Sequence, residues 1–332
     1  MKAIRIARHG GPEVLDLVET EDPSAGPGEL VVKVECAGVN FIDVYHRSGL
    51  YPLDLPASVG VEGVGVVEDV GPPAPEADPA APRFALGDRV AWILARGAYA
   101  ERARIPASRA LVLRDGDPSA RTAAVLLQGL TAHYLVHDCG PVGHTLGAGS
   151  RALVHAAAGG VGLLLVQWLA RLGVRVFGTV SSADKAELAR EAGAEEVRVA
   201  REAESAEAVL AWTKGRGVHI AYDSVGQSTL RASLAALRPR GMLVSYGQSS
   251  GTPPSITTRE LGARSLFMVR PGLQDFVATR AEYDGRANDV LALVRSGALR
   301  VRIDSELPLA EAPRAHRRLE SRSSAGKILL HP

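Results

Sequence analysis

The feature that most constrains the fold of this chain is a cluster of small side chains at residues 155–162, which read HAAAGGVG. The cluster lies between the apolar run RALV and the long apolar stretch LLLVQWLARLG, which are typical of a buried strand and a buried helix. At such a junction, small residues let the backbone approach a ligand, and the helix N-terminus offers unpaired N–H groups and the positive end of its dipole. The turn therefore predicts an α/β fold with a phosphate-binding site between strand and helix.

From about residue 126 onward, predicted strands and helices alternate. We expect strands in RALVHAA, VRVFGTV, EEVRVA, VHIAYDSVG and MLVSYGQSSG. We expect helices in GVGLLLVQWLARLG, SADKAELAREAG, ESAEAVLAWTKG and STLRASLAALRPRG. This alternation indicates a parallel sheet covered by crossover helices, so residues 126–267 are predicted to form a doubly wound Rossmann domain.

The rest of the chain is predicted to form a second domain, as a length of 332 residues also suggests. Residues 1–125 contain the short strand-like runs KAIRI, VLDLVE, ELVVKVECAGV, GVEGVGVVEDVG and DRVAWIL, and a predicted surface loop, GPPAPEADPAAPRFALG. The final segment, residues 268–332, ends in AHRRLESRSSAGKILLHP. We expect a helix and a short strand there, and the strand to return to the first domain.

The composition is that of a soluble globular protein, with 46% hydrophobic residues, 23% charged residues and a formal net charge of +1. This balance gives no electrostatic reason to expect nucleic acid or an anionic membrane as the primary partner. The N-terminus lacks the apolar core of a signal peptide, and no stretch approaches the roughly 20 apolar residues of a membrane span. Cys36 and Cys139 lack metal-binding spacing. We therefore expect a cytoplasmic protein without disulfides.

The small-residue turn matches a dinucleotide fingerprint of the form AxGxxG, with Ala157, Gly159 and Gly162 at its three positions. Its place after a predicted strand and before a predicted helix favours dinucleotide binding. The alternative is that the glycines only allow the helix to pack tightly on the sheet, which is partly true of Gly162 in either case.

The end of the next strand bears on which dinucleotide is bound. An NAD site usually carries Asp or Glu there for the ribose 2′-hydroxyl. Here Val180 is followed by Ser181 and Ser182, with Lys185 just inside the next helix. Hydroxyl donors and an ammonium suit a 2′-phosphate, so the sequence favours NADPH. The alternative is that Lys185 lies on a solvated helix face.

Several motifs occur along nearly the whole chain in the order of a known family: HGGPEVL, GVNFIDVYHRSGLYP, HAAAGGVG, YDSVG, SYGQSSG and ESR. The chain resembles the quinone oxidoreductase branch of the zinc-independent medium-chain dehydrogenase/reductases, the group that includes zeta-crystallin. The resemblance implies a GroES-like β-rich catalytic domain, completed by the C-terminal segment, joined to the Rossmann domain, with the active site in the cleft between them. It also implies a homodimer joined through the Rossmann sheets.

The resemblance also implies the residues of the site. The implied catalytic residues are Asn40, Asp43, Tyr45 and Tyr51. The implied cofactor-binding residues are Phe41, Ile42, Val44, Thr131, Ala158, Gly159, Gly160, Val161, Gly178, Ser181, Ser182, Lys185, Arg201, Ser224, Tyr246, Gly247, Gln248, Ser249, Met268, Val269, Arg270 and Arg322. Simpler alternatives stay open for single members, since Asp43 could cap a helix and Tyr51 could pack a loop.

Two departures from related sequences are informative. Zinc alcohol dehydrogenases of the same superfamily carry Cys at the position of Asn40 and His before the residue that corresponds to Glu62. Asn40 and Val61 cannot serve as those ligands, so no metal is expected and alcohol oxidation is disfavoured. Related bacterial reductases often carry Tyr where this chain has Ala200 and Arg201. Lys185, with Arg201, must then provide the contact to the 2′-phosphate.

The sequence therefore predicts an NADPH-dependent quinone oxidoreductase that transfers hydride to a quinone. The negative charge that develops on the acceptor oxygen would be stabilised by the Asn40 amide or the Tyr45 hydroxyl. One alternative is a reductase of 2-alkenals or enones on the same scaffold. Another is a nucleotide-binding protein whose main role is that of a crystallin or an RNA binder, although the balanced charge argues against RNA. His155 is expected to be a packed strand residue.

Overall fold

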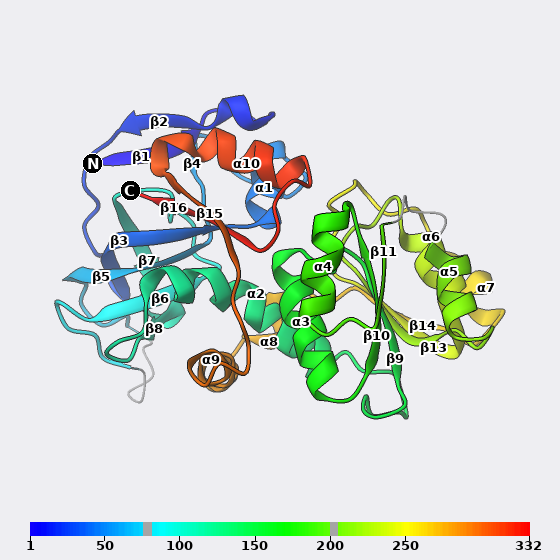
Figure 1. Cartoon of the computed structure of the whole chain (residues 1–332). Helices are drawn as coiled ribbons and strands as arrows, with labels where there is room; N and C mark the ends of the chain where they lie inside the picture. The colour runs from blue at the N-terminus through cyan, green and yellow to red at the C-terminus, as the bar shows by residue number, and fades with distance from the viewer. Residues whose placement is uncertain (76–81, 200–204) are drawn as a thin grey trace. The chain divides into compact units, whose positions relative to one another are not determined.

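The structure, a computed structural model, describes residues 1–75, 82–199 and 205–332 (Figure 1). The chain forms two compact units, each assembled from separate stretches of sequence. Unit 1 consists of Met1–Leu127, Ala278–Ala292 and Val301–Pro332, and unit 2 of Gln128–Val277 and Leu293–Arg300. The segment 268–332, predicted to complete the first domain, thus contributes to both units.

Unit 1 is built mainly on antiparallel strands. Its larger sheet has the order β15-β16-β3-β5-β6-β8, with β7 also paired to β3, and its smaller sheet has the order β2-β1-β4. The strands are β1 (Lys2–Ile6), β2 (Asp16–Glu19), β3 (Glu29–Val39), β4 (Ala57–Ser58), β5 (Glu62–Val70), β6 (Arg89–Ile93), β7 (Arg102–Pro106), β8 (Ala110–Val112), β15 (Ile303–Pro308) and β16 (Lys327–His331). Valine and isoleucine at buried positions of these strands form one apolar core with Trp92 and Tyr99.

The C-terminal strand completes the sheet of unit 1. β16 pairs antiparallel with β3, with Leu330 opposite Ala37, and parallel with β15. The predicted return of the C-terminal segment to the β-rich unit is therefore confirmed. Figure 1 shows β16 beside β3, although the two strands come from opposite ends of the chain.

The helical elements of unit 1 are short. They are α1 (Phe41–Ser48), α10 (Ala312–Glu320) and the 3-10 turns η1 (Pro12–Val14), η2 (Ala107–Arg109) and η4 (Leu309–Glu311). Two longer helices, α2 (Ser119–His137) and α9 (Arg280–Arg295), each run from one unit into the other. Among the described residues, no helix is both long and apolar enough to span a bilayer.

Unit 2 contains a six-stranded sheet in the order β11-β10-β9-β12-β13-β14, and all its strand pairs are parallel. The strands are β9 (Arg151–Val154), β10 (Arg175–Val180), β11 (Glu196–Val199), β12 (Val218–Asp223), β13 (Leu237–Ser245) and β14 (Phe267–Val269). Counted along the unit, this is the order 3-2-1-4-5-6 of the Rossmann fold, so the predicted fold class is confirmed. The strand order reverses between β9 and β12, and ligands bind such sheets at that point.

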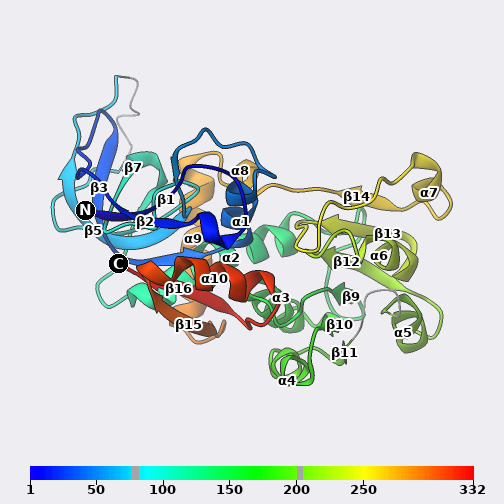
Figure 2. The same cartoon turned by 90° about the horizontal axis from the view of Figure 1, so that it is seen from above.

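The helices of unit 2 cover both faces of its sheet. α3 (Gly160–Arg171) and α4 (Ala183–Glu191) lie on one face, and α5 (Ser205–Trp212) and α6 (Leu230–Ala236) on the other (Figures 1 and 2). The two short helices α7 (Thr258–Gly262) and α8 (Leu273–Phe276) complete the unit. This is the arrangement that right-handed crossovers produce when they run outward from a central strand in both directions.

One predicted helix is too long. A helix was predicted over the whole stretch STLRASLAALRPRG. In the structure, α6 ends at Ala236 and β13 begins at Leu237. Pro239 cannot donate the backbone hydrogen bond that a helix needs. The Arg264 guanidinium also donates to the carbonyl oxygens of Leu234 and Leu237, both at 2.6 Å, and so satisfies acceptors at the end of α6. The prediction was therefore wrong for residues 237–241.

Candidate active site and nucleotide site

Helix α1 positions the residues that the sequence predicts to be catalytic. Asn40 has an extended backbone (φ −133°, ψ 157°) and precedes the first turn, and its N–H donates to Asp43 Oδ2 at 2.8 Å. Gly49 ends the helix with φ +80°, a conformation that glycine adopts without strain. Asp43 thus satisfies a donor at the helix start, which favours the alternative that it caps the helix.

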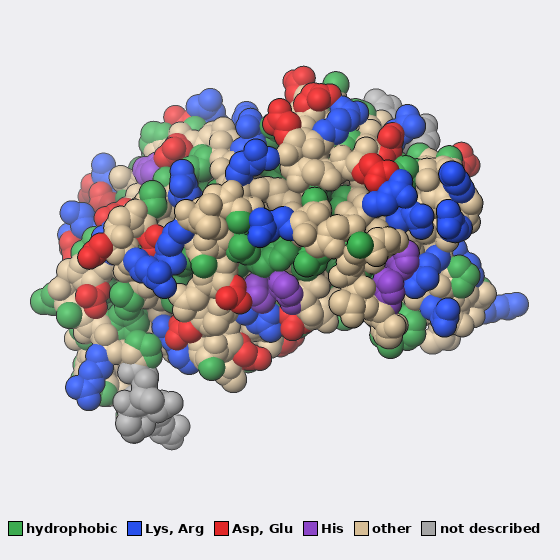
Figure 3. All heavy atoms as spheres, turned by 60° about the horizontal axis from the view of Figure 1, so that its bottom comes forward, with side chains coloured by type: hydrophobic (Ala, Val, Ile, Leu, Met, Phe, Trp, Pro, Cys, Tyr) green, Lys and Arg blue, Asp and Glu red, His purple; other side chains and the backbone are tan. Residues whose placement is uncertain are grey.

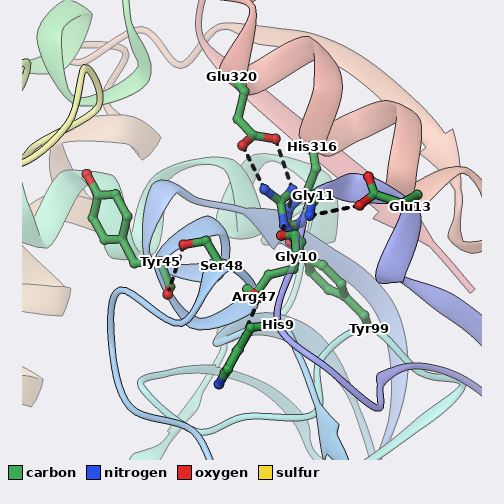
Figure 4. A network of polar contacts seen from close by, with 10 residues as sticks. All are labelled: His9, Gly10, Gly11, Glu13, Tyr45, Arg47, Ser48, Tyr99, His316 and Glu320. Carbon is green, nitrogen blue, oxygen red and sulfur yellow. Dashed lines mark hydrogen bonds and ion pairs between the residues drawn. The ribbon is translucent and has the colours of Figure 1, made fainter.

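The two faces of α1 carry different groups. Asp43 and Arg47 are buried within unit 1, with 0% and 2% exposed surface. Tyr45 points away from Arg47 in Figure 4. The Tyr45 ring lies 5.1 Å from the ring of Tyr51 and 6.1 Å from that of Phe41, measured between centroids. The structure therefore brings these three predicted residues together in one aromatic group, with Ile42 and Val44 on the same helix.

A buried chain of hydrogen bonds connects the inner face of α1 to α10. Arg47 donates to both carboxylate oxygens of Glu320, at 2.7 and 2.9 Å (Figure 4). It also lies 3.2 Å from His316 Nδ1, and because a guanidinium can only donate, Nδ1 is the acceptor. His316 Nε2 then donates to the Tyr99 hydroxyl at 3.3 Å, and that hydroxyl donates to Asp43 Oδ2 at 3.0 Å. Donation thus runs from Arg47 to Asp43.

Burial shifts the pKa values of the side chains in this series of hydrogen bonds. It lowers the pKa of His316 to about 3, and the neighbouring Arg47 charge acts in the same direction. It raises the pKa of Asp43 to about 7, against the hydrogen bonds from Asn40 and Tyr99, which lower it. Burial, with the Asp43 carboxylate, also raises the pKa of the Tyr99 phenol. His316 is therefore neutral at physiological pH, as its hydrogen bonds to Arg47 and Tyr99 require.

A second buried cluster holds the start of α1. The Lys327 ammonium lies 2.5 Å from Glu62 Oε2 and donates to Asn40 Oδ1 at 2.7 Å. Asn40 Nδ2 donates to Glu62 Oε2 at 2.9 Å and to the Gly38 carbonyl oxygen at 3.1 Å. The other Glu62 oxygen accepts from the backbone N–H of Leu127 at 2.7 Å. Both hydrogens of the Asn40 amide are used inside the protein.

In unit 2, the predicted nucleotide-binding residues gather at one edge of the sheet. Because the carboxyl ends of parallel strands meet at the same edge, the segments that follow β9, β10, β12, β13 and β14 lie there together. These segments contain Ala158, Gly159, Gly160, Val161, Ser181, Ser182, Lys185, Ser224, Tyr246, Gly247, Gln248, Ser249 and Arg270. Arg201 lies outside the described residues.

The remaining predicted residues occupy other positions. Gly178 lies within β10, and Thr131 lies in the part of α2 that belongs to unit 2. Met268 and Val269 belong to β14, the last strand in the sheet order. Arg322 follows α10 in unit 1 and has a left-handed backbone, with φ +57°.

The turn between β9 and α3 needs its glycines for close approach. A Cβ on Gly162 would lie 2.2 Å from the Ala156 carbonyl oxygen, so only glycine fits between turn and helix. A Cβ on Gly159, the residue before α3, would meet only the backbone oxygen and side chain of Ala156 within 4 Å. The 12-residue helix α3 starts directly behind this small-residue surface, and the N–H groups of its first turn have no partners within the helix.

Asp223 and Arg270 organise the neighbouring loops. The buried Asp223 carboxylate accepts hydrogen bonds from the backbone N–H groups of Val225 and Gly226, both at 2.9 Å, and from the Thr229 and Ser233 hydroxyls. The Arg270 guanidinium donates to the carbonyl oxygens of Ser245 and Gly247, at 3.1 and 3.0 Å, and Ser249 N donates to Ser224 O at 3.2 Å. The loops after β12 and β13 are thereby held together.

His155 is a packed residue, as the sequence predicts. It is 1% exposed, and its Nδ1 atom lies 2.8 Å from Thr179 Oγ1. Burial lowers its pKa, so the imidazole is neutral.

Comparisons with known proteins agree with this geometry. The family described as "Alcohol dehydrogenase GroES-like domain" matches residues 26–138, and "Zinc-binding dehydrogenase" matches residues 160–283. A quinone oxidoreductase of Pseudomonas aeruginosa is 40% identical over 100% of this chain and 99% of its own length. The chain belongs to the quinone oxidoreductase family of the medium-chain dehydrogenase/reductases.

Two further relatives of this chain are informative. The structure of Escherichia coli quinone oxidoreductase complexed with NADPH has a TM-score of 0.93 and 38% identity, covering 100% of both chains. A 2-haloacrylate reductase of Burkholderia is 38% identical over 98% of both chains.

The name "Zinc-binding dehydrogenase" implies a zinc ion, but the side chains of the present protein do not fit one. Among the described residues, no group of three or more His, Cys, Asp or Glu side chains could hold a metal. At Asn40 and Glu62, the Lys327 ammonium already contacts an oxygen of each side chain, at 2.7 and 2.5 Å. A divalent cation at these oxygens would have to displace that positive charge.

Sequence analysis missed several residues of the buried clusters around α1: Arg47, Glu62, Tyr99, His316, Glu320 and Lys327. Their partners are far apart in the sequence, so no local spacing connects them. One signal was available, because Lys327 is a charged residue at the start of a predicted apolar strand in a chain with few lysines.

Proposed function

We propose that this protein is an NADPH-dependent quinone reductase that transfers hydride to the quinone without a zinc ion. The observation that carries the proposal is the Rossmann edge of unit 2, where the β9–α3 turn, two serines and Lys185 offer donors for phosphate groups. The E. coli quinone oxidoreductase that was solved with NADPH covers this chain from end to end at 38% identity, which supports both the nucleotide and the acceptor.

The residues of unit 2 fit the parts of the nucleotide. The pyrophosphate would bind at the N-terminus of α3, where Gly159 leaves room and the first-turn N–H groups can donate. The 2′-phosphate would bind Ser181, Ser182 and Lys185. The loop after β12, organised by Asp223, and the loop after β13, held by Arg270, are joined by the hydrogen bond from Ser249 N to Ser224 O, and together they would support the nicotinamide end.

The chemistry divides between nucleotide and protein. When bound, NADPH supplies the hydride. The acceptor oxygen then gains negative charge, and a nearby hydroxyl can donate to it. Because both amide hydrogens of Asn40 are used by Glu62 and Gly38, Tyr45 is the better of the two predicted donors. Tyr45, Tyr51 and Phe41 would orient a planar acceptor through their aromatic faces.

A second candidate has support of its own. The 38% identity to a 2-haloacrylate reductase over 98% of both chains favours an activated alkene as an alternative acceptor. Hydride addition to such an alkene also places negative charge next to a carbonyl or carboxyl group, so the same tyrosine could serve both reactions.

The test is a panel of acceptors assayed with NADPH and with NADH. We expect naphthoquinone and 1,4-benzoquinone to be reduced with NADPH, and enones, 2-alkenals and haloacrylates to react more slowly. Faster reduction of the alkenes would establish the second candidate. Ethanol oxidation, or no turnover with any acceptor, would contradict the reductase function.

We also propose that the protein works as a cytoplasmic homodimer. Cys36 and Cys139 are both buried thiols that form no disulfide, which suits a reducing compartment. The exposed edge of β14 suits a dimer contact. Nucleic acid is not proposed as the primary partner, because the net charge is +1 and basic and acidic side chains are interspersed on the face drawn in Figure 3.

A further inference from the structure

The ion pair between Lys327 and Glu62 has no role in the function proposed so far. Both side chains are 0% exposed, and their charged atoms are 2.5 Å apart. Removing two charges from water costs about as much as their attraction returns, so a buried pair is weak evidence for a stabilising role. The pair therefore calls for another explanation.

The ammonium holds the oxygen end of the Asn40 amide. Lys327 donates to Asn40 Oδ1 at 2.7 Å, and because an ammonium can only donate, it must face the oxygen and not the nitrogen of the amide. The nitrogen then faces Glu62 Oε2 and the Gly38 carbonyl oxygen, and both accept its hydrogens. The ammonium therefore holds the oxygen end of the amide, while the two acceptors hold its nitrogen end.

The same cluster reaches a second helix. Glu62 Oε1 accepts from the backbone N–H of Leu127 at 2.7 Å. Leu127 lies inside α2 and is the residue at which the first stretch of unit 1 ends. One carboxylate therefore contacts both Asn40, the residue directly before α1, and an amide within α2.

The other end of α1 is anchored separately. Arg47, in the last turn, is held by Glu320 and by the Gly10 carbonyl oxygen, at 3.1 Å from Arg47 Nε. Tyr45 lies between these two anchors and points away from the Arg47 anchor (Figure 4). The position of its hydroxyl thus depends on how both ends of α1 are held.

Building on the proposed reductase function, we propose that Lys327 is a positioning residue for hydride transfer. Its ammonium holds the oxygen of the Asn40 amide and the Glu62 carboxylate, and through them it fixes the N-terminal end of α1 and hence Tyr45. A displacement of about 1 Å in such a group can slow a reaction about a hundredfold, so the role is measurable.

The test removes both charges together, because Lys327→Met alone would leave Glu62 buried without a counter-charge. In Lys327→Met/Glu62→Gln, we expect kcat to fall about tenfold to a hundredfold, while the Kd for NADPH stays unchanged. The kinetic isotope effect with NADPH deuterated at the transferred position should rise, because hydride transfer becomes slower. The matched control is Arg102→Met/Glu68→Gln, which removes a partly exposed ion pair of unit 1 and should leave kcat unchanged.

A purely structural role predicts a different result. In that case the folded double variant would have the same kcat as the unmodified protein, and the proposal would be overturned. If the double variant does not fold, Asn40→Ala tests the same idea, because it removes the oriented amide and leaves the ion pair in place. It should reproduce the loss in kcat, and unchanged turnover would again overturn the proposal.

Amide hydrogen exchange separates this proposal from the proposed function. In the double variant or in Asn40→Ala, residues 40–48 should exchange at least about tenfold faster than in the unmodified protein, while β12 and β13 are unaffected. If the unmodified protein reduces no acceptor, the reductase function is wrong. In that event unchanged exchange in α1 would also reject the role of Lys327, and faster exchange would support its role in holding the helix.

Discussion

Lys185 lies in the first turn of α4, three residues after Ser182, where the ribose of a bound dinucleotide is expected. If its ammonium meets the 2′-phosphate, Lys185→Glu replaces attraction with repulsion. A charge-assisted hydrogen bond contributes roughly 1.5–3 kcal/mol, so the Kd for NADPH should rise at least about tenfold to a hundredfold. NADH lacks the 2′-phosphate, so its Kd should change little. Fluorescence titration of the variant with each nucleotide would measure both Kd values.

The two nucleotides serve as controls for each other. Equal weakening of NADPH and NADH would assign Lys185 to the fold or to the shared pyrophosphate site. If neither Kd changes, Lys185 lies on a solvated helix face, and Arg201 becomes the next residue to test. Raised salt should narrow the preference of the unmodified protein for NADPH, because a partly exposed ion pair is screened.

His316 predicts an acid-sensitive contribution to stability. Burial lowers its pKa from 6.5 to about 3, so between these values the unfolded chain binds a proton that the folded chain does not. The contribution of His316 is complete above about pH 6.5 and is lost as the pH falls toward 3. His316→Gln cannot take up the proton, so its melting temperature should fall less between pH 7 and 4 than that of the unmodified protein. Parallel pH curves would contradict the buried, neutral imidazole.

Asp43 predicts the opposite slope. Its pKa rises from 3.8 to about 7 in the folded protein, so folding takes up a proton between these values. The contribution of Asp43 to stability is complete below about pH 3.8 and is lost as the pH rises through 7. Asp43→Asn should therefore lose less stability than the unmodified protein between pH 5 and 8, as denaturant melts at fixed pH would measure. A steeper loss in the variant would show that the carboxylate is stabilised by its neighbours.

At the scale of elements, the β9–α3 turn joins the packing of unit 2 to its proposed ligand. A Cβ on Gly162 would lie 2.2 Å from the Ala156 carbonyl oxygen, so Gly162→Ala must push α3 away from the turn. We expect a loss of roughly 1–3 kcal/mol in the free energy of unfolding and a higher Kd for NADPH. The matched control is Gly140→Ala, since a Cβ there meets no atom within 4 Å. Equal stability of the two variants would disprove the tight packing.

Most elements could be predicted from the sequence because their signals are local. The apolar runs of β9, β10 and β12 and the glycine turn before α3 depend on neighbours within a few residues, and they indicated the Rossmann unit correctly. The boundary between α6 and β13 was predicted wrongly although Pro239 was a local signal against the helix, and Arg264, a residue of a later segment, binds the carbonyl oxygens at the helix end. Periodicity carries no information about such a partner.

The candidate site could be predicted only in part, for the same reason. The fingerprint turn and the NFIDVY motif are contiguous, so the sequence could point to Gly159 and Tyr45. The cluster of Asn40, Glu62 and Lys327 forms only when β16 pairs with β3 and β5 pairs with β3 on its other side. Which residues meet there depends on strand order, and strand order depends on the whole chain.

The whole molecule brings its chain ends together in one unit. β1 and β16 both belong to unit 1, while unit 2 is formed mainly by the segment between them. The sheet of unit 1 therefore includes strands from both ends of this sequence. Lys327, which we propose as a positioning residue, begins β16, the strand that pairs with both β3 and β15.

The dimer is the prediction that belongs to this largest scale. β14 ends the sheet order of unit 2 and pairs with β13, and its Phe267 and Met268 side chains are each 36% exposed. An edge strand with exposed apolar side chains is a template for pairing with a second copy.

Light scattering should give a particle of twice the chain mass of 34.9 kDa. Phe267→Arg should convert it to a monomer, because an unpaired charge in the contact is costly. Leu172→Arg, which replaces another exposed apolar residue of unit 2, should remain a dimer. A monomeric unmodified protein would contradict the dimer, and a dimeric Phe267→Arg would move the contact away from β14.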